Sequence, residues 1–116
     1  MFEKELSLRP WGKYEKLFQE SGVWVKRIEV NPASRLSLQK HQHRSERWFV
    51  LSGEGLATVN DSQIPVKKGS TMDVPLGAVH RMANTAAVPL VFIELAFGDQ
   101  LSEDDIIRLQ DDYNRA

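Results

Sequence analysis

The chain has 116 residues, which is enough for a single domain over residues 1–116 with one core, and too few for two domains. Hydrophobic residues make up 41% of it and charged residues 27%, a balance typical of a folded globular protein rather than a disordered one. The net charge of −1 gives no reason to expect nucleic acid or an anionic membrane as a partner, and the lack of cysteine excludes disulfides, thiolate metal ligands and a cysteine nucleophile.

The first 14 residues are predicted to form an irregular arm. Pro10 disfavours a helix and Gly12 permits a bend, so we expect residues 1–14 to lead into the first strand, with Trp11 and Tyr14 packed on the body of the fold. The arm has no apolar signal core, and no later run approaches membrane-spanning length. We therefore expect a cytoplasmic protein with no membrane partner.

Short runs of β-prone residues, separated by turn signals, occupy most of the chain. Residues 90–97 form the most apolar run and are predicted to be a central core strand. Many short strands in one small domain favour an antiparallel barrel or sandwich. The predicted strands are residues 14–18, 23–30, 48–51, 56–59, 64–66, 72–74, 79–82 and 90–97.

The pattern changes after residue 98, where a short helix is predicted. Ser102 is followed by three acidic residues, which suits a helix N-cap with acids in the first turn. Ile106, Leu109 and Tyr113 then recur at helical spacing. We expect one amphipathic helix within residues 102–113.

One polar stretch concentrates side chains that bind metals. In a strand, Gln39, His41 and His43 would project from one face, because side chains alternate with a period of two. Glu46 is out of phase by one residue, which a turn at residues 44–45 would correct. Two imidazoles, an amide oxygen and a carboxylate suit a borderline divalent metal. The alternative is a polar strand face that simply meets water.

A second stretch favours the metal site, because its spacing matches a known motif. Gly69, Pro75, Gly77, His80 and Asn84 stand at the positions of the second motif of the cupin superfamily, which this chain resembles here. In that family the histidine is a metal ligand inside a small jelly-roll β-barrel. The resemblance therefore implies an all-β fold and a metal-binding role for His80.

The first cupin motif fits the polar stretch in one register. Pairing His41 with His43 would leave only two residues before Glu46, too few for the family spacing. The resemblance thus implies Gln39, His41, Glu46 and His80 as metal ligands. His43 would then contact either these ligands, without binding the metal, or the substrate. In this register the Gly, His, His, Glu and Gly positions of the family's first motif are held by Ala33, Gln39, His41, Glu46 and Gly53.

A closer resemblance covers about residues 8–115. Residues 9–12, 39–48, 75–84 and 103–106 look like the type II phosphomannose isomerase domain, the C-terminal part of bifunctional enzymes that also carry mannose-1-phosphate guanylyltransferase activity. The 116 residues contain no Gly-rich nucleotide-binding segment, so we expect a free-standing isomerase-type domain that does not itself make GDP-mannose.

This resemblance implies interconversion of mannose 6-phosphate and fructose 6-phosphate by proton movement between C1 and C2. It implies one divalent ion acting as a Lewis acid, zinc first, with manganese, nickel or cobalt as alternatives. His43 is the predicted proton carrier, unless it is merely solvated. Arg44 and Arg81 are the predicted partners of the substrate phosphate. We expect a homodimer with a small sugar phosphate as its ligand.

Two other functions stay open at this point. One is a non-catalytic cupin module that binds a sugar or a metal, since this architecture hosts many functions. The other is an iron-dependent cupin dioxygenase, which usually has two histidines and one carboxylate. Gln39, in place of a histidine, argues against the dioxygenase.

Overall fold

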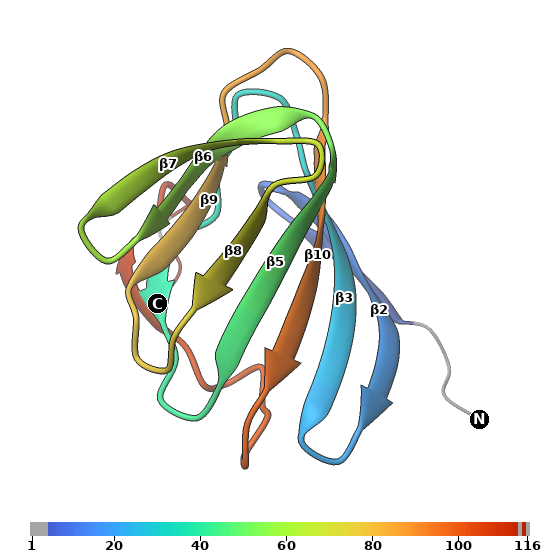
Figure 1. The fold of residues 1–116 in the computed structure, drawn as a ribbon, viewed down its shortest axis with the longest axis vertical. Helices are drawn as coiled ribbons and strands as arrows, with labels where there is room; N and C mark the ends of the chain where they lie inside the picture. The colour runs from blue at the N-terminus through green and yellow to red at the C-terminus, as the bar shows by residue number, and fades with distance from the viewer. Residues whose placement is uncertain (1–4, 114, 116) are drawn as a thin grey trace.

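Two antiparallel sheets face each other and enclose one core (Figure 1). The computed structural model describes residues 5–113 and residue 115. The six-stranded sheet has the order β1 (Glu5–Arg9), β2 (Gly12–Glu20), β3 (Val23–Val30), β10 (Leu90–Phe97), β5 (Ser45–Ser52), β8 (Thr71–Val74). The five-stranded sheet has the order β11 (Ile107–Gln110), β4 (Leu38–Lys40), β9 (His80–Asn84), β6 (Glu54–Val59), β7 (Ser62–Lys67). The prediction of an all-β fold is confirmed.

Alternation along the strands builds the core. In β3, every second residue from Trp24 to Val30 is buried, so this face points inward. The prediction that residues 90–97 form a central strand is confirmed, because β10 pairs with β3 on one side and β5 on the other. Leu90 and Phe92 are almost fully buried there. Burial of these apolar side chains is the main driving force that holds the two sheets together.

The motif position held by Ala33 has an unusual backbone. Its φ is 55°, in the left-handed region that glycine adopts at little cost and alanine does not. Gly53, at the other end of the same motif, has φ 89°, and a Cβ there would lie 2.6 Å from the carbonyl oxygen of Pro89. The turn at Ala33 therefore follows the path that the motif's glycine would take, with a strained residue in its place.

The predicted helix over residues 102–113 is wrong. The segment forms strand β11, in which Ile107 pairs with Lys40 and Arg108 with Gln39 on β4. Ser102 does accept a hydrogen bond from a backbone N–H of the acidic run, but the turn it starts is not continued. Pairing with β4 satisfies backbone groups of a strand that would otherwise form an open sheet edge. Among the described residues no helix is long and apolar enough to cross a membrane.

The prediction of an irregular arm over residues 1–14 is also wrong for the residues of this segment that the structure describes. Residues 5–9 form β1, which pairs antiparallel with β2, while residues 1–4 lie outside the described residues. The expected packing of Trp11 and Tyr14 is confirmed, since both belong to the buried core. A two-residue turn at Pro10 and Trp11 joins the two strands as a tight hairpin, and Gly12 begins β2 opposite Arg9.

Candidate metal centre

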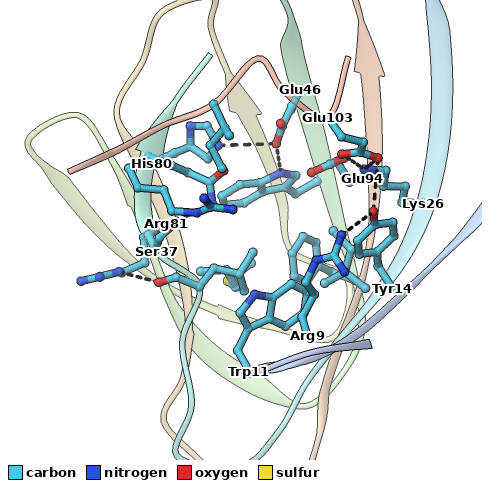
Figure 2. Close-up of a pocket in the computed structure, with 18 of the residues that line it drawn as sticks. Arg9, Trp11, Tyr14, Lys26, Ser37, Glu46, His80, Arg81, Glu94 and Glu103 are labelled. Carbon is cyan, nitrogen blue, oxygen red and sulfur yellow. Dashed lines mark hydrogen bonds and ion pairs between the residues drawn. The ribbon is translucent and has the colours of Figure 1, made fainter. Parts of the chain in front are cut away.

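A cavity lies inside the barrel, and both sheets and the C-terminal segment contribute to its wall (Figure 2). Apolar side chains such as Trp11 and Phe92 form part of it, but polar and charged side chains are numerous. A cavity of this kind, concave and lined by a few convergent polar groups, is where a small molecule binds in most proteins.

Three predicted metal ligands meet at the edge of this cavity, which Glu46 and His80 line and His41 does not. His41 follows β4, Glu46 lies on β5 and His80 begins β9, so the two sheets bring together residues that are up to 39 positions apart. Their ligating atoms all lie within 4.8 Å of one another, and all three side chains are buried. Nε2 of His41 is 3.2 Å from Oε2 of Glu46, and Nε2 of His80 is 3.8 Å from Oε1. This group could hold a metal ion.

Backbone carbonyls orient both imidazoles. Nδ1 of His80 lies 3.0 Å from the carbonyl oxygen of Ala78, and Nδ1 of His41 lies 2.5 Å from that of Asp105. With Nδ1 donating, Nε2 keeps its lone pair, which is the arrangement found in metal-binding histidines. Burial lowers the pKa of His80, so its ring is neutral at pH 7, as a ligand must be.

Glu46 is held as a carboxylate. Burial alone would raise its pKa, but the contact with His41, the charge of the His80 ring when it is protonated and the charge of Arg44 outweigh burial and hold the pKa well below its ordinary value. Its Oε1 accepts a hydrogen bond from Nε1 of Trp48 at 2.9 Å, and its Oε2 accepts one from Nε of Arg44 at 3.0 Å. The site therefore presents one fixed negative charge to a cation.

The structure places Gln39 beside this group and His43 away from the cavity. Gln39 is directly opposite His80 in the pairing of β4 with β9, is buried, and lines the cavity. Its Nε2 donates to the carbonyl of Ser37 at 3.4 Å, so its amide oxygen is the atom a metal would take. His43 is half-buried and is not among the described residues that line the cavity. Its backbone N–H donates to Asp105 at 2.8 Å.

The two predicted phosphate partners both line the cavity, but with their donors engaged. Arg44 is buried, and its Nη2 donates to Nε2 of His41 at 2.9 Å, so it lies against the predicted metal ligands themselves. Arg81 donates from Nε to the carbonyl of Leu36 at 2.9 Å, and from both Nη atoms to Gln110 at 3.3 Å. It thus ties β9 to the C-terminal strand.

Glu94 is a cavity residue that the sequence reasoning missed. It lies on β10, opposite Lys26 on β3 and Trp48 on β5, and is 7% exposed. Its Oε2 has no hydrogen-bond partner among the described residues. Burial, then the charge of Glu46, raises its pKa to about 8. The available signal was one acid within the most apolar run, together with Lys26 on the inward face of the neighbouring strand.

Comparison with known proteins gives one family for almost the whole chain. The family described as "Mannose-6-phosphate isomerase C-terminal" matches residues 3–111. "Alginate biosynthesis protein AlgA" of Pseudomonas aeruginosa is 43% identical over 107 residues, which cover 92% of this chain and 22% of that protein. "Mannose-1-phosphate guanylyltransferase" of Escherichia coli is 40% identical over 107 residues, covering 92% of this chain and 23% of that protein. The chain thus spans less than a quarter of the length of these relatives.

Solved structures support the fold. The capsular polysaccharide assembling protein CapF of Staphylococcus aureus superposes with a TM-score of 0.78 at 17% identity, over 95% of this chain and 35% of that one. A cupin-2 domain from Rhodospirillum rubrum superposes with a TM-score of 0.71 at 21% identity, over 89% of this chain and 77% of that one. At such low identity these likenesses establish the cupin fold alone.

Proposed function

We propose, from the premise that this chain belongs to the mannose-6-phosphate isomerase C-terminal family, that it interconverts mannose 6-phosphate and fructose 6-phosphate with one divalent metal ion. The observation that carries the proposal is the buried His41–Glu46–His80 group, of which Glu46 and His80 line a cavity inside the barrel. The guanylyltransferase activity named for the longer relatives is not part of this proposal.

The residues present fit a metal. Two imidazoles whose Nε2 atoms lie 3.2 and 3.8 Å from one carboxylate are a donor set that zinc accepts, and manganese, nickel or cobalt are the alternatives. His41, Glu46 and His80 would hold the ion, with Gln39 as the proposed fourth ligand. When bound, such an ion supplies Lewis-acid polarisation of the sugar oxygens.

A proton must also move between C1 and C2, and Glu94 is the best-placed group to carry it. It lines the cavity and lies on the strand next to Glu46. Its pKa of about 8 lies close to pH 7, and a general acid–base group works best when its pKa is near the working pH. His43, the carrier predicted from sequence, does not line the cavity in the described part of the chain.

A non-catalytic binding module is the alternative, and one observation favours it. The guanidinium of Arg44 donates to Nε2 of His41 and to Oε2 of Glu46, two of the atoms that a metal would use. In a binding module this arginine could serve as the permanent cation of the site. In an isomerase it must give up these contacts when a metal ion binds.

The proposal is tested by turnover together with metal content. We expect the purified chain to hold one metal ion and to convert mannose 6-phosphate to fructose 6-phosphate in an assay coupled to glucose-6-phosphate formation. A chelator should abolish turnover, and added zinc or manganese should restore it. A folded chain with full metal content and no turnover would favour the binding module. The predicted homodimer and cytoplasmic location stay predictions.

A further inference from the structure

The three acids at residues 103–105 lie in the loop before β11, and their surroundings differ. Glu103 lies at the cavity, where its carboxylate binds Lys26 on β3 at 2.6 Å (Figure 2). Asp104 is exposed, and no side-chain hydrogen bond is found for it among the described residues. Asp105 is half-buried and contacts the loop between β4 and β5. The ion pair of Glu103 and the pairing of β11 with β4 hold the chain in place on both sides of Asp105.

The loop between β4 and β5 carries a predicted metal ligand but belongs to no strand. Its residues 41–44 therefore lie outside the hydrogen-bonded ladders of both sheets. The carboxylate of Asp105 supplies acceptors for the backbone of this loop. Its Oδ1 accepts a hydrogen bond from the N–H of Gln42 and its Oδ2 accepts one from the N–H of His43, both at 2.8 Å. One carboxylate thus fixes two successive peptide groups of the loop.

The backbone of Asp105 makes a third contact, with the ring of His41. Its carbonyl oxygen lies 2.5 Å from Nδ1 of His41, although the two residues are 64 positions apart in the sequence. A carbonyl oxygen can only accept a hydrogen bond, so Nδ1 carries a proton and is not available to a metal. Nε2 is the nitrogen that remains, and it lies 3.2 Å from Oε2 of Glu46. Asp105 thus determines which nitrogen of His41 meets the other predicted ligands.

We propose that Asp105 is a positioning residue of the metal centre, which clamps residues 41–43 so that Nε2 of His41 faces the carboxylate of Glu46 before a metal ion binds. Groups that hold a metal ligand in place commonly raise metal affinity roughly 10- to 100-fold, because the ligand does not have to be ordered when the metal binds. The proposal rests on the proposed function for the presence of a metal ion. The clamp itself follows from three contacts of 2.5, 2.8 and 2.8 Å.

Zinc affinity and hydrogen exchange test the clamp in the intact chain. Asp105→Ala removes both carboxylate acceptors, so we expect its Kd for zinc, measured by competition with a chromogenic chelator, to be at least about tenfold higher. In the metal-free protein the backbone N–H groups of Gln42 and His43 should exchange with deuterium faster, whereas those of β10 should not change. Asp105→Asn keeps one acceptor oxygen and should give an intermediate Kd, and it takes the place of the alanine variant if that variant does not fold.

Two variants of the same segment are the controls. Asp104→Ala removes the same charge one residue away, and Asp112→Ala breaks an ion pair with Arg35, in which the paired atoms are 2.7 Å apart. Both should bind zinc as the unchanged chain does and leave exchange in the loop unchanged. A loss of affinity in Asp112→Ala as large as that in Asp105→Ala would overturn the proposal, because a general loosening of the C-terminal segment would then explain both.

Equal zinc affinity in Asp105→Ala and Asp104→Ala would also overturn the proposal, as would unchanged exchange at Gln42 and His43. The isomerase proposal fails separately. If zinc binding depends on Asp105 while the zinc-loaded chain shows no turnover, the positioning role stands and the isomerase does not. Turnover together with a zinc affinity that does not depend on Asp105 gives the reverse. A chain that binds no zinc would overturn both.

Discussion

Replacing Asn84 by alanine removes three hydrogen bonds that hold β9 to its surroundings. The side chain is 3% exposed. Its Nδ2 donates to the carbonyl of Val30 at 3.0 Å and to that of Val88 at 2.8 Å, and its Oδ1 accepts from the N–H of Ala86 at 2.9 Å. Each such bond contributes about 1 kcal/mol net, so we expect the free energy of unfolding to fall by about 3 kcal/mol.

For a chain of this size a loss of this magnitude corresponds to a decrease of about 10 °C in Tm. Urea unfolding followed by tryptophan fluorescence gives the free energy, and calorimetry gives the Tm. Asn31→Ala is the control, because Asn31 is exposed and no side-chain hydrogen bond is found for it among the described residues; its effect should stay within about 0.5 kcal/mol. A loss below about 1 kcal/mol in Asn84→Ala would refute the structural role assigned to this motif residue.

Three further predictions concern the backbone, the metal and the buried acid. Ala33→Gly should raise the free energy of unfolding by about 0.5–1 kcal/mol, since relief of the left-handed strain exceeds the entropy cost of glycine, whereas Ala87→Gly on an exposed loop should not raise it. His80→Ala should lose the metal in elemental analysis while His43→Ala keeps it; the opposite result would make the predicted motif register wrong. Glu94→Gln should keep the metal and lower turnover at least about a hundredfold. In metal-free protein, the raised pKa of Glu94 means that the folded state holds the Glu94 proton more tightly than the unfolded chain does. The free energy of unfolding should therefore fall as the pH rises from about 4.5 to about 8. Glu94→Gln should remove this fall.

Local sequence patterns were enough to predict most of the strands and the cluster of His41, Glu46 and His80. Alternating burial along residues 23–30 and the apolar run at residues 90–97 are properties of the strands themselves, so the sequence carries them. The motif spacing likewise predicted that His80 would meet His41 and Glu46, because the turns that set the spacing also set the register of the strands.

The errors came from contacts between distant segments. Ser102 and the acids after it do start a turn, but pairing of residues 107–110 with β4 decides the outcome, and no local pattern encodes that partner. The same acids have tertiary roles, since Glu103 binds Lys26 at 2.6 Å and Asp105 accepts hydrogen bonds from the backbone N–H groups of Gln42 and His43. Glu94 was missed because an average over an apolar run does not show which of its residues faces the cavity.

The central claim, isomerisation by proton transfer at this metal centre, is tested most directly by incubating the metal-loaded chain with mannose 6-phosphate in deuterated water. Proton NMR would then follow both the C2 proton of mannose 6-phosphate and the appearance of fructose 6-phosphate. The account predicts that the C2 signal disappears as deuterium enters and that fructose 6-phosphate accumulates, both only with metal present and both strongly slowed in Glu94→Gln. Conversion without exchange would contradict the proton-transfer role of Glu94. A folded, metal-loaded chain that shows neither exchange nor conversion would contradict the isomerase itself.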